Sequence, residues 1–207
     1  MMADLVDHRT GSNHVRDFRR TLFHYRSYTP IPFLLVMVLF AQPTAVTMAI
    51  GAAMTLLGES LRFWGVAYAG SLTRVTANVG APEIIVSGPF ARTRNPLYLG
   101  NILLYTGIGV MANALAPWLV LAALAYFLFQ YLSIVSLEEE FLEKEFGAAY
   151  REYKASVPRF IPRLSVYTDP AQERQKPRWR EAVRSERRTL QATGLVLALL
   201  VVLWLWR

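Results

Sequence analysis

Two polar clusters flank a hydrophobic hairpin in this sequence. The first is the stretch 87–100, SGPFARTRNPLYLG, which ends as the hairpin begins, and the second is Glu138-Glu139-Glu140, which follows the hairpin. Both feet of a membrane hairpin lie on the same membrane face, so the polar groups of the two clusters will meet there. Arginine, asparagine, tyrosine and carboxylate side chains together offer charges, donors and acceptors. We therefore expect a site for a polar cofactor at this face.

The composition indicates a membrane protein. Of the 207 residues, 54% are hydrophobic and only 18% are charged, which is too apolar for an ordinary soluble domain. We expect the basic residues that give the chain its net charge of +7 to lie next to the membrane. Membrane lipids rather than nucleic acid are therefore the expected partners. The chain has no cysteine, and His8, His14 and His24 are not spaced as metal ligands, so we expect no metal site.

Five apolar segments are candidates for spanning helices, which need roughly 20 residues. They are residues 28–41, 44–69, 97–112, 115–136 and 189–206. The first of them is short unless residues 25–29 extend it. After the fourth segment, residues 137–154 show the spacing of an amphipathic helix, with Gly147 as a break. We therefore predict an all-α integral membrane protein with about five transmembrane helices, cytosolic cofactor-binding loops and a C-terminal amphipathic segment.

The distribution of Lys and Arg predicts the orientation. Of these 22 residues, five precede residue 30, three lie in 71–96 and twelve lie in 137–188, while the connections around Pro43 and Pro117 contain none. The positive-inside rule then places the N-terminus and both polar clusters of this multi-pass protein on the cytoplasmic side.

Glu59 and Arg62 are charged residues inside the second predicted span. Because they are three positions apart, they share one face of a helix. Two interpretations are open: the pair faces a substrate inside the membrane, or Arg62 extends to the interface and Glu59 pairs with it.

The ordered motifs resemble one family of membrane enzymes. The chain is similar to the isoprenylcysteine carboxyl methyltransferase family and its phospholipid methyltransferase relatives. The motifs that carry the resemblance are Gly88-Pro89-Phe90, RNPLYLG at 94–100, the hairpin, Glu138-Glu139, Phe146-Gly147, Tyr150, Tyr153, Val157-Pro158 and Ile161-Pro162. The resemblance spans 80–164, which we take as a methyltransferase core between an N-terminal part (1–79, with the first two spans) and a C-terminal part (165–207, a basic connector and the last span).

The resemblance implies S-adenosylmethionine as cofactor, bound on the cytosolic side of the hairpin, and a lipophilic acceptor that enters from the bilayer. Glu138 would accept hydrogen bonds from the cofactor, and the start of the third span would bind its carboxylate. The expected cofactor contacts are Glu83, Ile84, Ile85, Phe90, Asn95, Pro96, Leu97, Tyr98 and Glu138. No catalytic residue is assigned, and Arg94 and Glu139 are the candidates.

Two positions depart from the family pattern. Asn95 stands where the prenylcysteine enzymes commonly have histidine, and Ile134 stands where the eukaryotic enzymes carry an arginine for the substrate carboxylate. We expect Arg62, Arg159 or Arg163 to replace that arginine, and the expected substrate contacts are these three residues and Glu59, the neighbour of Arg62.

The sequence thus predicts a methyltransferase that uses S-adenosylmethionine on a lipophilic acceptor, either an isoprenylcysteine-like carboxylate or another lipid or small amphiphile. Two alternatives stay open: an NADPH-dependent membrane reductase with a related hairpin, and a noncatalytic membrane scaffold. The oligomeric state is not predicted.

Overall fold

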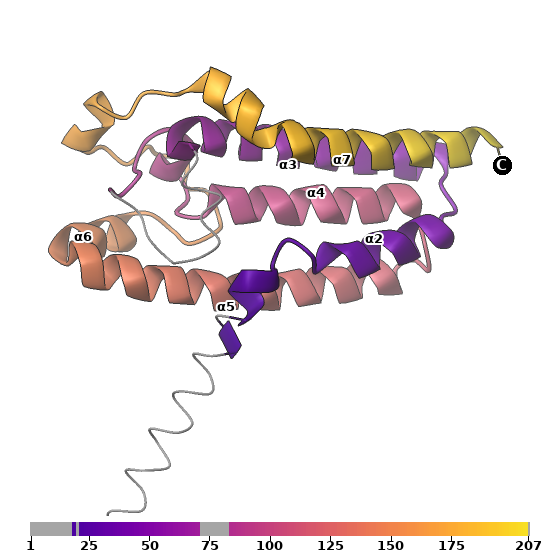
Figure 1. The fold of residues 1–207 in the computed structure, drawn as a ribbon, viewed down its shortest axis with the longest axis horizontal. Coiled ribbons are helices and arrows are strands. Elements are labelled where there is room, and N and C mark those ends of the chain that lie inside the picture. The colour runs from indigo at the N-terminus through magenta and orange to yellow at the C-terminus, as the bar shows by residue number, and fades with distance from the viewer. Residues whose placement is uncertain (1–17, 20, 71–82, 207) are drawn as a thin grey trace, which may run out of the picture.

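The computed structural model describes residues 18–19, 21–70 and 83–206, and it is all-α in these ranges. The α-helices are α2 (Pro30–Leu39), α3 (Ala45–Ala69), α4 (Pro96–Ala112), α5 (Trp118–Phe146), α6 (Ala148–Ser156) and α7 (Trp179–Trp206), with the short 3-10 helices η2 (Gly88–Ala91) and η3 (Pro170–Glu173) in the connections. The long helices run side by side, and α4 lies in the middle of the bundle between α3 and α5 (Figure 1). A bundle arranged in this way places both ends of the α4–α5 hairpin at the same end of the molecule.

The helix ends follow local chemistry. Pro30 and Pro96 occupy the first turns of α2 and α4, where the missing N–H of proline costs nothing. α3 begins with a capping box in which Thr44 and Thr47 exchange hydrogen bonds. Gly147 has a φ of 55° and separates α5 from α6, as the sequence predicts.

Glycines let α3 and α4 pack closely. A Cβ on Gly51 would lie 2.4 Å from the carbonyl oxygen of Gly107, and a Cβ on Gly58 would lie 2.6 Å from that of Gly100. Small residues at such positions allow the backbones of two membrane helices to touch. The close approach also brings Arg62 of α3 against the first turns of α4, since a Cβ on Gly100 would lie 2.6 Å from the Arg62 Cγ.

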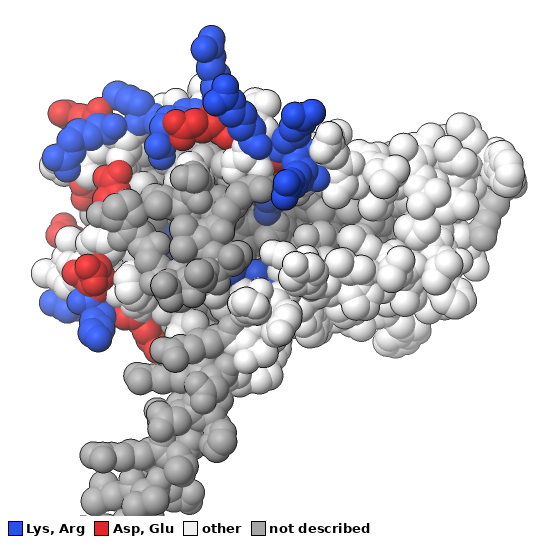
Figure 2. Space-filling model, viewed as in Figure 1, with Lys and Arg blue, Asp and Glu red and all other residues white. Residues whose placement is uncertain are grey.

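Helices form in all five segments predicted to span the membrane. By length and composition alone, α5 and α7 are the two described helices that could cross a membrane, and α2 and α4 are shorter apolar helices. On the face shown in Figure 2, the charged side chains lie at one end of the molecule and the opposite end shows none. This distribution agrees with a membrane protein, and the five-crossing topology stays a prediction.

Three boundaries differ from the predicted ones. α2 covers only Pro30–Leu39, because a turn occupies residues 26–29. α5 continues past residue 136 to Phe146 without a break, since residues 137–146 are mostly the strong helix formers Leu, Glu and Lys. α7 begins at Trp179 rather than at 189, because the Arg- and Glu-rich stretch before the apolar part also favours helix. The predictions for residues 1–17 and 71–82, the cytoplasmic N-terminus among them, lie outside the described residues.

The connections at the charged end pack together. Val157–Arg163 folds back onto the loop before α4, where the backbone N–H of Arg94 donates to the Pro158 carbonyl and that of Arg163 donates to the Arg92 carbonyl, both at 2.9 Å. A small core of Val86, Tyr150, Tyr153 and Val157 fills the space beneath. These contacts fix the two polar clusters relative to each other.

Candidate active site

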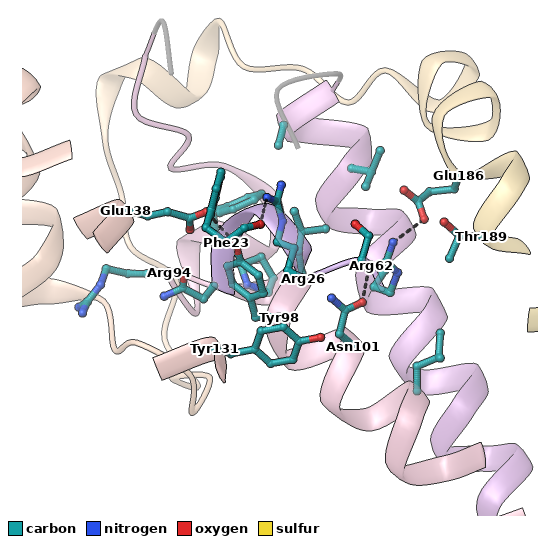
Figure 3. Close-up of a pocket in the computed structure, with 18 of the residues that line it drawn as sticks. Phe23, Arg26, Arg62, Arg94, Tyr98, Asn101, Tyr131, Glu138, Glu186 and Thr189 are labelled. Carbon is teal, nitrogen blue, oxygen red and sulfur yellow. Dashed lines mark hydrogen bonds and ion pairs between the residues drawn. The ribbon is translucent and has the colours of Figure 1, made fainter. Parts of the chain in front are cut away.

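One cavity of about 870 Å³ connects the charged end of the bundle with its interior. It is lined by residues of α2, α3, α4, α5, α6 and α7 and of the segment 83–90 (Figure 3). We call the part next to the hairpin feet the outer arm. The structure brings all the predicted cofactor contacts to this cavity: Glu83, Ile84, Ile85, Phe90, Asn95, Pro96, Leu97, Tyr98 and Glu138. Their contact with a cofactor stays a prediction.

A hydrogen bond joins the two feet of the hairpin inside the outer arm. The Tyr98 hydroxyl, in the first turn of α4, donates to Oε1 of Glu138 at 2.7 Å. Glu138 lies beyond Leu137, where the 20-residue apolar part of α5 ends, and so outside the predicted spanning segment 115–136. Burial raises the pKa of the Glu138 carboxyl to about 7, although the hydrogen bond from Tyr98 and the nearby Arg26 guanidinium act to lower it. Glu138 is therefore poised to gain a negative charge near neutral pH.

Glu139 ties together the loops on both sides of the outer arm. Its buried carboxylate accepts hydrogen bonds from Nη2 of Arg94 at 2.8 Å and from Nη2 of Arg159 at 2.5 Å. Burial opposes the charge, but the two arginines outweigh it and hold the pKa of Glu139 below its ordinary value. Nη1 of Arg94 also donates to the carbonyls of Lys154 and Val157. Nε of Arg94 donates to Glu139 as well, at 3.1 Å, so all its guanidinium nitrogens are engaged. The two catalytic candidates, Arg94 and Glu139, therefore hold the loops in place.

The loop before α4 is fixed by the same fold-back segment. The Asn95 side-chain amide donates to the Arg159 carbonyl at 3.0 Å, and the Thr93 hydroxyl reaches the same carbonyl at 3.2 Å. Asn95 does not cap α4 with its side chain, so the first turn of this helix has no side-chain cap. The uncapped N-terminus leaves backbone N–H groups and the positive end of the helix dipole available at the cavity.

Two glutamines that the sequence did not single out hold the segment 83–87. The Gln175 amide oxygen accepts from the backbone N–H of Val86 and the Ser87 hydroxyl, both at 3.0 Å, and its nitrogen donates to the Ile84 carbonyl at 2.8 Å. Gln172 donates to the Val86 carbonyl at 2.9 Å. The segment forms no strand, and the glutamine side chains pair with its backbone as a neighbouring strand would. No sequence signal links these glutamines to a segment some ninety residues earlier.

Comparison with known proteins places these elements in a family. The profile of the family described as "Phospholipid methyltransferase" matches residues 46–149, half of the chain. The chain belongs to the phospholipid methyltransferase family. Methyltransferases of this family use S-adenosylmethionine. The finer resemblance to isoprenylcysteine carboxyl methyltransferases is not shown by this match.

Two curated relatives are similar over part of their length. One is the cobalt-zinc-cadmium resistance protein CzcN of Cupriavidus metallidurans, 36% identical over 119 residues, which are 58% of this chain and 51% of the relative. The other is the nickel-cobalt-cadmium resistance protein NccN of Alcaligenes xylosoxydans xylosoxydans, 32% identical over 85 residues, which are 41% of this chain and 38% of the relative. The chain thus spans about half the length of these relatives or less. No solved structure matches the chain.

The residues that match the family profile include α3, α4 and α5, with Tyr98, Glu138 and Glu139. α2, the fold-back segment, the glutamine pair and α7 lie outside the matched residues. The cavity is therefore built from a family core and from walls that the profile does not cover.

The interior part of the cavity, which we call the inner arm, contains a polar cluster from three helices. Arg62 of α3 donates through Nη2 to Glu186 of α7 at 2.7 Å and through Nη1 to Asn101 of α4 (Figure 3). The Oε2 atom of Glu59 lies 4.0 Å from Nε of Arg62. The sequence pairs Glu59 with Arg62, but it gave no signal for Glu186, which lies 124 positions after Arg62.

The four predicted substrate contacts separate in the structure. Arg62 lines the cavity, whereas Glu59, Arg159 and Arg163 are not among its lining residues. Arg159 is bound to Glu139, and Nη1 of Arg163 donates to the Ser156 carbonyl at 2.5 Å. Ile134 is fully buried in the hydrophobic core. Of the three arginines considered as replacements at that position, Arg62 is therefore the one that reaches the cavity.

Proposed function

We propose that this chain is a membrane methyltransferase that binds S-adenosylmethionine in the outer arm and a lipophilic acceptor in the inner arm. The observation that carries the proposal is that one continuous cavity contains both arms. Its outer arm combines an uncapped helix start with a carboxylate, and its inner arm is walled by apolar side chains of α2, α4 and α7. The family match supports the reaction class, and the acceptor belongs to the proposal.

The residues of the outer arm fit the parts of the proposed cofactor. A carboxylate at Glu138 accepts hydrogen bonds from an ammonium or from ribose hydroxyls. The start of α4 suits the carboxylate of the amino acid group, and Ile84, Ile85 and Phe90 offer an apolar wall for adenine. The donor and acceptor types at this site therefore match those of S-adenosylmethionine.

When bound, S-adenosylmethionine supplies a methyl group on a positively charged sulfur. A nucleophile can attack the methyl carbon and displace the sulfur directly. The contribution of the protein is then mostly alignment and exclusion of water. Tyr98 orients the Glu138 carboxylate, and the Glu139 cluster fixes the two loops that enclose the outer arm. The acceptor atom, whether oxygen, nitrogen or sulfur, must reach the outer arm from the inner arm.

We also propose that the cavity opens to the cytoplasmic side of a protein with five crossings. The supporting observation is that no charged residue occurs in 27–58, 97–137 or 189–206, while the site and the connections around it are rich in charge.

Binding of S-adenosylhomocysteine to the purified protein in lipid nanodiscs tests the proposed function. We expect saturable binding that Glu138→Gln and Tyr98→Phe weaken, with a loss of about tenfold for Glu138→Gln, because a hydrogen bond to a charged group contributes roughly 1.5–3 kcal/mol. Glu140→Gln is the matched control, since Glu140 lies two positions further along the helix, is exposed and pairs with Arg19. Binding of NADPH alone would favour the reductase, and binding of neither cofactor would favour a scaffold. Labelling of membranes with methyl-labelled S-adenosylmethionine would then identify the acceptor.

A further inference from the structure

One side of α7 faces away from the bundle and carries a row of arginines. The buried residues of this helix, Ala182, Glu186 and Leu200, lie on the opposite side, where α7 packs on α3 and α4. The exposed side begins with four arginines spaced by four, three and one positions, which brings them onto one helix face. We call them the arginine face: Arg180, Arg184, Arg187 and Arg188. Figure 2 shows Lys and Arg side chains that project from the charged end, where Figure 1 places the start of α7.

The arginine face forms no ion pair with the described residues. Two acidic residues lie in the same stretch of α7: Glu181 pairs with Arg178 at 3.4 Å, and Glu186 lies buried on the opposite side. Arginines three or four positions apart on a helix repel each other. A negatively charged partner would therefore be attracted by several arginines at once and would relieve their repulsion.

The same side of α7 continues as an apolar surface. Leu195, Val202 and Leu205 follow the arginines at helical spacing and are 73%, 51% and 71% exposed. By length and composition, α7 is one of the two described helices that could cross a membrane. The acyl chains of a bilayer would shield these side chains from water, whereas the bundle leaves them exposed. A ligand that fits this side of α7 therefore combines a negatively charged head with an apolar chain.

Three of the four arginines lie at the depth of lipid headgroups. The apolar part of α7 begins at residue 189. At a rise of about 1.5 Å per residue, Arg184, Arg187 and Arg188 lie within about 8 Å of that boundary, and Arg180 lies about 14 Å from it. Each headgroup layer of a bilayer is about 5–8 Å thick. Arg180 is therefore expected to lie beyond this layer, whereas the other three are expected to meet the lipid phosphates.

We infer that this side of α7 is a binding site for an anionic phospholipid, with the lipid phosphate on Arg184, Arg187 and Arg188 and the acyl chains along the apolar surface below them. Guanidinium groups bind phosphate oxygens through paired, charge-assisted hydrogen bonds. A zwitterionic phospholipid also carries a cation, which the arginines repel, so a head with a net negative charge is preferred. The inference rests on the proposed insertion of α7 in the membrane and not on methyl transfer.

Native mass spectrometry of this chain tests the site. The protein is released from detergent micelles that contain equal amounts of phosphatidylglycerol and phosphatidylcholine with the same acyl chains, and the lipid adducts are resolved by mass. We expect about tenfold more adduct with phosphatidylglycerol than with phosphatidylcholine, because several basic residues contribute to the attraction. A ratio near one in the wild type would overturn the inference.

Substitution of two arginines that do not line the cavity locates the site. Arg184→Gln with Arg187→Gln is expected to bring the lipid ratio close to one, because each basic residue near anionic lipid contributes about fivefold in affinity. Arg151→Gln with Arg180→Gln is the matched control, since it removes the same charge from exposed arginines of α6 and of the first turn of α7. The control should leave the ratio unchanged, and an equal fall in both double variants would contradict the proposed position of the site.

Two further measurements distinguish a lipid site from other anion sites. Glycerophosphoglycerol, the same headgroup without acyl chains, is expected not to displace the bound lipid, and displacement would show a site for soluble anions instead. Arg184→Lys with Arg187→Lys keeps the charge and is expected to keep most of the preference for phosphatidylglycerol. A loss as large as with glutamine would refute the electrostatic argument.

Binding of S-adenosylhomocysteine to the same variants reports folding and separates this inference from the proposed function. If the wild type prefers phosphatidylglycerol but does not bind S-adenosylhomocysteine, the methyltransferase proposal fails and the lipid site stands. If it binds S-adenosylhomocysteine without a lipid preference, the lipid site fails and the methyltransferase proposal stands. If Arg184→Gln with Arg187→Gln misfolds and loses S-adenosylhomocysteine binding, Arg187→Gln alone decides: we expect a ratio about fivefold lower than in the wild type, and an unchanged ratio contradicts the inference.

Discussion

A methyl group added at Gly58 is expected to destabilise the bundle, although alanine is a better helix former than glycine. The new Cβ would lie 2.6 Å from both the Gly100 carbonyl oxygen and the Leu104 backbone nitrogen. Ordinary contact begins at 3.4 Å, so α3 and α4 must separate by about 0.8 Å. Both opposing atoms belong to the backbone, so no side-chain rotation can relieve the clash.

The magnitude follows from two opposing effects. Overpacking of a tight contact costs about 1–3 kcal/mol, and replacing glycine by alanine in a helix gains about 1 kcal/mol. We therefore expect Gly58→Ala to lower the free energy of unfolding by up to about 2 kcal/mol. Gly194→Ala in α7 is the matched control, because its Cβ would meet nothing within 4 Å and only the helix gain applies.

Unfolding in mixed micelles, followed by circular dichroism as the fraction of denaturing detergent increases, measures both variants. The expected order of stability is Gly194→Ala above the wild type and Gly58→Ala below it. Equal stability of Gly58→Ala and Gly194→Ala would refute the close approach of α3 and α4, and with it the placement of Arg62 against α4.

Four further predictions concern the cavity and its orientation. With the pKa of Glu138 at about 7, affinity for S-adenosylhomocysteine should rise several-fold from pH 6 to pH 7.5 as the carboxylate ionises, and Glu138→Gln should flatten this dependence in calorimetric titrations. Because the pKa of Glu138 is higher in the folded than in the unfolded protein, protonation of Glu138 stabilises the folded apoprotein. This contribution is complete below pH 4.5 and is lost as pH rises towards 7. Thermal unfolding of the wild type and of Glu138→Gln would reveal it. Gln175→Leu leaves the Val86 N–H and the Ile84 carbonyl without their partner. It should therefore cost about 1–3 kcal/mol of stability and weaken S-adenosylhomocysteine binding. Lys176→Leu, at an exposed neighbouring position, should do neither. Because the chain lacks cysteine, a single cysteine at Ala116 should react with an impermeant maleimide on intact cells, while one at Glu173 should react only after permeabilisation, and the reverse pattern would contradict the proposed orientation.

Much of the helical framework can be predicted from the sequence because apolar length and local breakers determine it. Pro96 and Gly147 mark helix limits that the structure confirms, and the five apolar segments all contain helices. The end of α5 was less predictable, since residues 137–146 suit either a new helix or the continuation of the old one, and only the bundle decides.

The outer arm could also be predicted from the sequence, because its residues lie at the two feet of one hairpin. Tyr98 and Glu138 are close in space for that reason alone. The inner arm could not be predicted from the sequence. Arg62 and Glu186 meet through the packing of α7 on α3, and neither the spacing nor the type of these residues indicates which helices become neighbours. The contact of Gln175 with the segment 83–87 could not be predicted for the same reason.

The late position of α7 in the chain has a consequence for biosynthesis. The ribosome completes α3, α4 and α5 well before it releases Glu186 and the apolar stretch after it. Until α7 is inserted, Arg62 has Glu59 on its own helix but lacks Glu186, whose Oε2 lies 2.7 Å from its Nη2, and the cavity lacks one wall. A nascent or prematurely terminated chain would therefore expose an arginine whose shortest ion pair is not yet formed, the kind of defect that membrane quality control can recognise, and the cavity is complete only once α7 is in place.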